Sequence, residues 1–340
     1  MISSLAVAIA LVASLPTPHV PIEVFSQDPL PTIEAPSYVL FDVTGDMTLA
    51  SQAADEPRPM ASVTKLMTAL VVLDNTELGD PVVISDSAAD TGEAEVGLVA
   101  GETWTVWELL NAIIVRSGND AATALAEHVG GSVAGFADLM NAKAAELGMT
   151  SSHFVNPHGL DADGHFSSAN DLLTLGLAAL DDPVLARLAR TRVVKFRTAP
   201  NGAVRRAVNT NELLGAFEGV AGLKTGFTSK AGRVLVSAAA RDGRTLVAVV
   251  MGTEDHFADT RELLAYGFDM FGLVDRLLAP LAGEQGGGIP AAIDQAEAAR
   301  LRLVPELPLV DATAQRRRTP LEDRIYEAIV SLMPPILEAP

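Results

Sequence analysis

Two β-hairpin patterns, one early and one late in the chain, limit the folds that this sequence can adopt. The first covers residues 38–49 and turns at Thr44-Gly45-Asp46. The second covers residues 233–251 and turns at 241–244, where an Asp-Gly pair joins two β-rich runs. Such a pair is a strong hairpin signal, because both residues tolerate the positive φ angles of tight turns. Strands at both ends with helices between them predict one antiparallel sheet built from distant segments.

Helical periodicity fills the stretch between these hairpins. In residues 62–75, Leu66, Leu70 and Leu73 recur on one helical face. The same spacing predicts further helices at residues 107–115, 120–129, 136–147, 170–180 and 261–271. We therefore predict an α+β fold in which helices flank an antiparallel sheet.

The first of three short polar motifs, Ser62-Val63-Thr64-Lys65, stands at the start of the first predicted helix. Positions i and i+3 share a helical face, so the Lys65 amine can reach the Ser62 hydroxyl. A serine is a poor nucleophile until a base takes its proton. Lysine becomes such a base if burial and a second cation lower its pKa. The alternative is an N-cap serine followed by a surface lysine, and the spacing alone does not exclude it.

The second motif is Ser117-Gly118-Asn119. On a tight turn, the Ser117 hydroxyl could relay a proton and Asn119 could hydrogen-bond a substrate amide. The alternative is an ordinary turn and cap before the helix that follows. Residues 168–170 fit the same pattern, but apolar helical residues follow them at once, so we interpret that copy as a helix start.

The third motif, Lys224-Thr225-Gly226, occurs once in the chain. We expect Gly226 to let a substrate backbone lie close to a strand, where Lys224 and Thr225 would bind a carboxylate through a charge-assisted hydrogen bond. Lys224 would also be the cation that lowers the pKa of Lys65. The alternative is an exposed lysine on an edge strand.

Together and in this order, the three motifs are typical of penicillin-binding proteins and class A β-lactamases. The surrounding residues are more specific. From about residue 34 to 275 the chain resembles the D-alanyl-D-alanine carboxypeptidase family, the low-molecular-mass penicillin-binding proteins. The segments that carry this resemblance are 61–69, 116–122, 222–228, 231–233 and Asn156-Pro157-His158-Gly159-Leu160.

This resemblance implies the penicillin-recognising β-lactamase/transpeptidase-like fold, an antiparallel sheet flanked by helices with an added helical subdomain. It implies a serine peptidase that removes the terminal D-alanine of peptidoglycan stem peptides through an acyl-enzyme, without metal or cofactor. Ser62 would be the nucleophile, Lys65 the general base and Ser117 the third catalytic residue. β-Lactam antibiotics would then bind covalently.

The resemblance also implies an oxyanion hole formed by the backbone N–H groups of Ser62 and Phe227. The substrate-binding residues that it implies are Asn119, Lys224, Thr225, Gly226 and Phe227. A DD-endopeptidase of the same family shares these motifs and stays open as an alternative. A class A β-lactamase is a weaker one, because Gly118 stands where those enzymes have Asp and the expected Glu-x-x-x-Asn run is missing. A catalytically inactive penicillin-binding protein is a third alternative, which the three intact motifs disfavour.

Charge and chain termini suggest where such a protein works. The net charge of −19 disfavours nucleic acid as a partner.

The apolar residues 1–15 predict a signal peptide, and hence export to the periplasm or the outer face of the cytoplasmic membrane. Residues 16–33 are predicted as a linker, 34–275 as the catalytic domain and 276–340 as an extension. Residues 321–333 have helical spacing, so peripheral membrane contact and a docking helix are both open.

Three histidines, His153, His158 and His165, lie close together with Asp161 and Asp163 among them. His and carboxylate side chains are metal ligands, but this spacing matches no helical zinc pattern. We favour a polar loop at this position over a metal site.

Overall fold

The computed structural model describes the backbone of residues 30–198 and 204–282. Within these ranges it describes all side chains except those of 197, 198, 204 and 272–282. These residues fall into two compact units, of which one holds 31–267 and the other holds residue 30 and 268–282. The site described below lies entirely in the first unit. In the described part of the chain, no helix has both the length and the apolar character needed to span a bilayer.

A five-stranded antiparallel sheet has the strand order β2-β1-β9-β8-β7. Both predicted hairpins are confirmed, and distant segments pair where β1 meets β9. Asp242 and Gly243 have φ angles of 49° and 74°, as a mirror-image hairpin turn requires. The strands are β1 (Ser37–Asp42), β2 (Met47–Gln52), β7 (Val220–Thr228), β8 (Gly232–Arg241) and β9 (Arg244–Thr253).

Helices make up much of the chain between β2 and β7, and one further helix follows β9, as the periodicity predicted. Ser62 belongs to the short 3-10 turn η2 (Ala61–Val63) rather than to the following α-helix. The predicted helix at 107–115 changes at Ala112 from α-helical to π-helical winding. The helices are α2 (Thr64–Asn75), α4 (Val106–Asn111), η3 (Ala112–Arg116), α5 (Asn119–Gly130), α6 (Val133–Glu146), α7 (Ala169–Asp181) and α9 (His256–Ala282).

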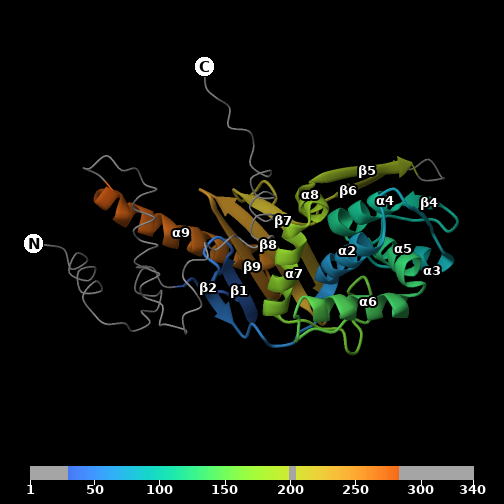
Figure 1. Cartoon of the computed structure of the whole chain (residues 1–340), viewed down its shortest axis with the longest axis horizontal. Helices are drawn as coiled ribbons and strands as arrows, with labels where there is room; N and C mark the ends of the chain where they lie inside the picture. Colours follow the sequence, from blue (N-terminus) through green and yellow to red (C-terminus); the bar gives the residue numbers. More distant parts are fainter. Residues whose placement is uncertain (1–29, 199–203, 283–340) are drawn as a thin grey trace, which may run out of the picture. The chain divides into compact units, whose positions relative to one another are not determined.

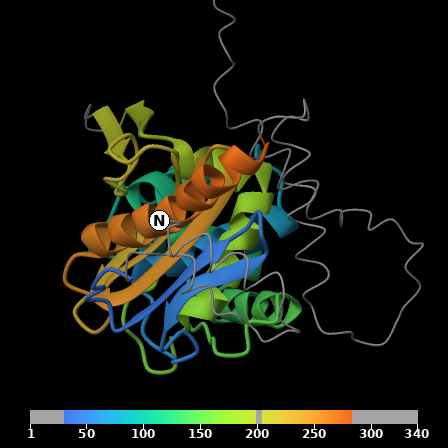
Figure 2. The ribbon, with the colours of Figure 1, turned by 90° about the vertical axis from the view of Figure 1, so that its left-hand side faces the viewer.

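The sheet has helices on both faces, because successive side chains of a strand point to opposite sides. A Cβ on Gly176 of α7 would lie 2.8 Å from Val236 on one face. A Cβ on Gly267 of α9 would lie 2.6 Å from Leu246 on the other face. Figures 1 and 2 show the sheet between α7 and the first turns of α9. This arrangement confirms the predicted α+β architecture.

A helical subdomain adjoins the α7 side of the sheet, built mainly from α2, α4, α5 and α6 (Figure 1). Its interior is apolar, and Met67, Trp104 and Phe136 are fully buried there. Ser168 caps α7 by accepting a hydrogen bond from the backbone N–H of Asp171, so the second Ser-x-Asn copy is a helix start, as predicted. The first motif lies at the start of α2 in this subdomain, and the third lies on strand β7 of the sheet.

Several elements were not predicted, mostly because they are too short to show periodicity. The start of helix α8 could have been predicted, because Pro183 directly follows the N-cap residue Asp182. The unpredicted elements are α3 (Asp86–Ala89), α8 (Pro183–Arg190), β3 (Pro81–Val83), β4 (Thr103–Thr105), β5 (Val193–Thr198) and β6 (Val204–Val208). The predicted signal peptide (1–15) and the helix at 321–333 lie outside the described residues, as do all but 30–33 of the linker.

Candidate active site

Ser62 lies on the η2 turn, half-buried, directly before α2. The preceding Ala61 has a φ of 49°, a left-handed value that residues with a Cβ seldom adopt. The Thr64 hydroxyl supports the turn by donating a hydrogen bond to the Ala61 carbonyl at 2.8 Å. Unusual backbone angles of this kind are concentrated at functional sites, where the surrounding structure holds them in place.

Two glycines let other segments press against this turn. A Cβ on Gly159 would lie 2.0 Å from the Ala61 carbonyl oxygen, and one on Gly226 would lie 2.9 Å from the Ser62 nitrogen. We expected Gly226 to leave room for a substrate backbone. The structure shows a close approach between β7 and the turn around Ser62 at this glycine, and room for a substrate backbone beside it stays a prediction. Gly159 therefore has a role that the sequence did not indicate.

Lys65 is completely buried, and its Nζ lies 3.0 Å from the Ser62 Oγ. The amine also donates to Asn119 Oδ1 at 2.7 Å and to the His158 carbonyl at 2.6 Å. Burial, and next the nearby positive charge of Lys224, lower the Lys65 pKa well below its usual value; Asp120 and Glu93 oppose this shift. The influence of Lys224 on the Lys65 pKa agrees with the prediction from the third motif.

Ser117 lies where the π-helical turn η3 ends, with a left-handed φ of 69°. Its hydroxyl is buried and makes no hydrogen bond to any residue in the described part of the chain. Asn119, in contrast, uses both ends of its amide: Oδ1 accepts from Lys65 and Nδ2 donates to the Gly92 carbonyl at 3.1 Å. The second motif thus supplies one free hydroxyl and one anchored amide.

The third motif lies on β7, with Lys224 fully buried. Its Nζ donates to the Thr225 carbonyl at 2.9 Å, and burial lowers the pKa of Lys224 to about 7. The Thr225 hydroxyl lies 2.6 Å from the hydroxyl of Thr210, a neighbour that the sequence did not indicate. Phe227 is 61% exposed, and the Arg233 guanidinium lies over its ring.

Residues 92–99, which we call the wall loop, are fastened to the start of α5. The Asp120 carboxylate is buried and accepts from the backbone N–H groups of Val96, Gly97 and Leu98 at 3.0–3.2 Å. Burial, its largest influence, raises the Asp120 pKa although these N–H groups oppose the shift. Since Asp120 directly follows Asn119, the wall loop is tied to the residue that contacts Lys65.

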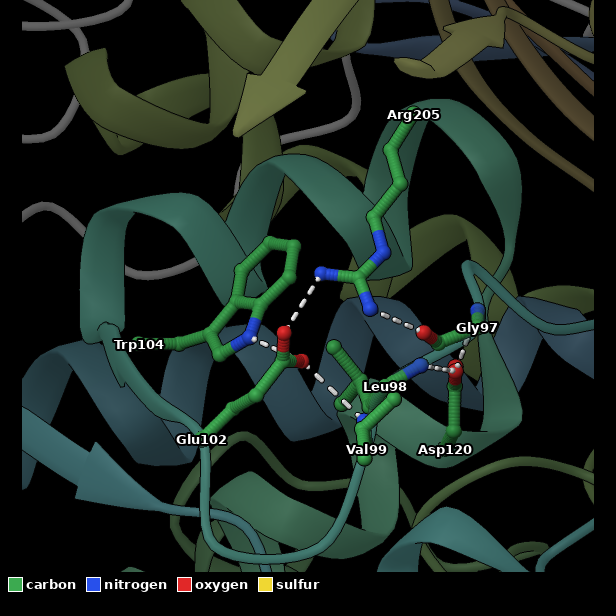
Figure 3. A network of polar contacts seen from close by, with 7 residues as sticks. All are labelled: Gly97, Leu98, Val99, Glu102, Trp104, Asp120 and Arg205. Carbon is green, nitrogen blue, oxygen red and sulfur yellow. Dashed lines mark hydrogen bonds and ion pairs between the residues drawn. The ribbon is translucent and has the colours of Figure 1, made fainter. Parts of the chain in front are cut away.

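Arg205 on β6 holds the wall loop from the other side (Figure 3). Its guanidinium donates to the Gly97 carbonyl at 2.5 Å and pairs with Glu102 at 3.0 Å. Glu102 also accepts from the Trp104 indole and the Val99 backbone. The hydrogen bonds from Arg205, Trp104 and Val99 outweigh the effect of burial and lower the Glu102 pKa. None of these contacts was indicated by the sequence.

Replacing Arg205 by methionine is expected to destabilise the protein by about 3 kcal/mol, because it leaves the largely buried Glu102 carboxylate without its cation. The Arg205 and Glu102 side chains are only 6% and 14% exposed. Urea unfolding of the variant measures the change. Arg206→Met is the matched control, since Arg206 is exposed on the same strand. Equal stability of the two variants would refute a structural role for this ion pair.

Each of the three clustered histidines has its own protein contact. His153 lies 2.7 Å from the Gly164 carbonyl, His165 lies 2.8 Å from the Thr64 hydroxyl, and His158 Nδ1 accepts from the Leu160 N–H. Burial first, and nearby cations next, lower the pKa of His158 to about 3, and burial lowers that of His165 to about 4. In the described residues, no group of three or more His, Cys, Asp or Glu is placed to hold a metal ion.

The fold and the three converging motifs are those of the penicillin-recognising class of proteins. The crystal structure of a D-alanyl-D-alanine carboxypeptidase from Mycobacterium tuberculosis superposes with a TM-score of 0.67 at 34% identity, covering 71% of this chain and 94% of that chain. A Streptomyces DD-transpeptidase gives a TM-score of 0.67 at 30% identity, over 71% of this chain and all of the other.

A model of the D-alanyl-D-alanine carboxypeptidase family matches residues 23–255. This chain belongs to that family. It is 39% identical to DacB2 of Mycobacterium tuberculosis over 66% of this chain and 76% of that protein. It is 35% identical to DacC of Escherichia coli over 71% of this chain, but over only 63% of the length of DacC.

Proposed function

We propose that this protein is a serine-type D-alanyl-D-alanine carboxypeptidase, which removes the terminal D-alanine of peptidoglycan stem pentapeptides through an acyl-enzyme at Ser62. The observation that carries the proposal is the 3.0 Å distance from the Lys65 amine to the Ser62 hydroxyl. A neutral lysine has two N–H bonds and one lone pair. The Asn119 and His158 oxygens take the two N–H bonds, which leaves the lone pair for the Ser62 proton.

The reaction follows from these positions. Lys65 takes the proton as Ser62 Oγ bonds to the carbonyl carbon of the penultimate D-alanine. The backbone N–H groups of Ser62 and Phe227 stabilise the oxyanion. The C–N bond then breaks, and the free Ser117 hydroxyl relays the proton from Lys65 to the leaving amine. Water, deprotonated by the same lysine, attacks the ester and releases the shortened peptide and Ser62.

Residues of the second and third motifs bind the peptide. Lys224 and Thr225 bind the terminal carboxylate, with Thr210 fixing the direction of the Thr225 hydroxyl at 2.6 Å. A carbonyl oxygen has two lone pairs, so Asn119 Oδ1 can accept from a substrate N–H while it keeps the bond from Lys65. β-Lactams resemble the acyl-D-alanine unit, so penicillin is expected to acylate the same serine.

Purified muropeptides test the activity against its nearest alternative. The carboxypeptidase is expected to release free D-alanine from pentapeptide monomers, measured with D-amino acid oxidase. A DD-endopeptidase would instead split cross-linked dimers without releasing free D-alanine. Loss of dimers alone would therefore replace the proposed reaction by the endopeptidase one.

The two lysines predict a bell-shaped dependence of kcat/KM on pH. Lys65 must be neutral, so activity rises as pH increases through its lowered pKa. Lys224 must be charged, so activity falls as pH rises past about 7, the pKa of Lys224 in the free enzyme. Arginine keeps its proton throughout this range, so Lys224→Arg is expected to move the alkaline limb above pH ~9. An alkaline limb that stays in place in this variant would exclude Lys224 as its source.

We propose export for this protein, with its action in the periplasm or at the outer face of the cytoplasmic membrane. The apolar residues 1–15 and the location of peptidoglycan outside that membrane support the proposal. Cleavage of the signal peptide and peripheral contact through residues 321–333 stay predictions. Fractionation of cells that express the full chain, with N-terminal sequencing of the mature protein, tests all three.

A further inference from the structure

Glu93, on the wall loop, is an acid that the proposed reaction leaves unused. Its side chain is exposed, and it makes no hydrogen bond or ion pair with any residue that the structure describes. Its neighbour Glu95 is occupied, since its carboxylate accepts from the Gly92 backbone N–H at 3.0 Å. Glu93 also has a left-handed φ of 61°, an unfavourable conformation for a residue with a side chain.

The backbone on both sides of Glu93 is bound to Asn119. The Gly92 carbonyl accepts from the Asn119 side chain at 3.1 Å, and the Ala94 carbonyl accepts from the Asn119 backbone at 2.6 Å. The Glu93 charge also acts on the buried Lys65 amine and raises its pKa. The exposed Glu93 carboxylate therefore stands on a segment bound directly to Asn119, close enough to Lys65 for its charge to act on the amine.

Glu93 is held in this place by the contacts already described. Asp120 binds three consecutive N–H groups of the wall loop, those of Val96, Gly97 and Leu98. Figure 3 shows the contacts of Asp120 with Gly97 and Leu98, and that of Arg205 with the Gly97 carbonyl. A charge on a fixed loop loses less side-chain and backbone freedom when it binds a ligand than a charge on a mobile one. The wall loop is thus fastened by hydrogen bonds on both sides, as a specificity-determining position requires.

The proposed binding mode would place the third residue of a bound peptide on the Glu93 side of Asn119. In the proposed function, on which this inference rests, the terminal carboxylate meets Lys224, the scissile carbonyl meets Ser62 and the penultimate amide meets Asn119. The next residue toward the peptide's N-terminus then lies beyond Asn119, along the wall loop. Positive groups thus face the peptide's terminal carboxylate, and a negative one faces its third residue.

We infer that Glu93 pairs with an ammonium group on the side chain of the residue before D-alanyl-D-alanine. The substrate class is then a stem peptide whose third residue is a diamino acid with a free side-chain amine. An exposed ion pair of this kind contributes modestly, so the expected discrimination is about 3- to 5-fold in kcat/KM.

Two synthetic peptides isolate this pair. Nα-acetyl-L-Lys-D-Ala-D-Ala keeps the side-chain ammonium, and the Nα,Nε-diacetyl peptide lacks it. The wild-type protein is expected to prefer the first by about 3- to 5-fold at low salt, mostly through KM. Glu93→Gln is expected to bring the ratio to about one, and Glu93→Lys to invert it. Each variant is assayed with both peptides. Any effect of Glu93 on the Lys65 pKa therefore changes both kcat/KM values alike and cancels in their ratio.

Glu77→Gln is the matched control, because Glu77 is exposed just past the far end of α2, the helix that begins beside Ser62. That variant is expected to keep the wild-type ratio. Equal use of both peptides by the wild type, or an unchanged ratio in Glu93→Gln, would overturn the inference while leaving the carboxypeptidase intact. Failure to hydrolyse either peptide would overturn the proposed function and this inference with it.

Discussion

Ser62→Ala is expected to lower kcat/KM for release of D-alanine by about 10⁴-fold or more, because no other group can form the acyl-enzyme. The only side-chain hydrogen bond that the structure gives the Ser62 hydroxyl is with Lys65, so the variant should fold normally. Release of D-alanine from a pentapeptide measures the loss, and thermal unfolding confirms the fold. Covalent labelling by fluorescent penicillin should vanish in parallel.

The matched control for this experiment is Ser51→Ala, since Ser51 is exposed on the edge strand β2. It should retain wild-type hydrolysis and labelling. Normal penicillin labelling of Ser62→Ala would mean that a different residue is acylated. The proposed mechanism would then fail as a whole, whatever the fold.

Lys65→Met is expected to lower the rate of acylation by about 10³-fold or more, because Ser62 loses the base that takes its proton. The Lys65→Arg variant distinguishes a role of Lys65 as a base from a role as a positive charge only. Arginine stays protonated at all working pH values, so it supplies the charge but cannot accept a proton. If Lys65 is the base, both variants are inactive in stopped-flow acylation by a chromogenic β-lactam.

Circular dichroism and the unfolding temperature of both variants show whether the buried position still folds. Lys143→Met is the control: Lys143 forms surface ion pairs with Asp74 and Glu146 and should be dispensable for acylation. Near-normal acylation by Lys65→Arg would contradict general-base catalysis by this lysine and leave it only an electrostatic role.

The Ser62–Lys65 contact was predictable because it is local, with the two residues three positions apart at a helix start. The i, i+3 rule brought the amine and the hydroxyl together, and the contact of 3.0 Å agrees with it. The sheet was predictable for a similar reason, since the turn at Asp242 and Gly243 is local and joins two β-rich runs. The resemblance to a family, more than spacing, brought Lys224 to the same site.

The supports of the site could not be predicted, because each of them joins segments that are distant in sequence. Asp120 follows the second motif directly, yet only the fold shows that its carboxylate binds N–H groups of the wall loop. Arg205 is one of several arginines in its region, and nothing local marks it as the buried partner of Glu102. Gly159 resembles a loop glycine until the Ala61 carbonyl is found against it.

The central claim is that the three motifs converge on one nucleophile, Ser62. The most direct test is mass spectrometry of the intact protein after exposure to benzylpenicillin, followed by peptide mapping. The expected result is a single adduct of the mass of the whole antibiotic, located on the peptide that contains Ser62. No adduct, or an adduct on a peptide without Ser62, would contradict it.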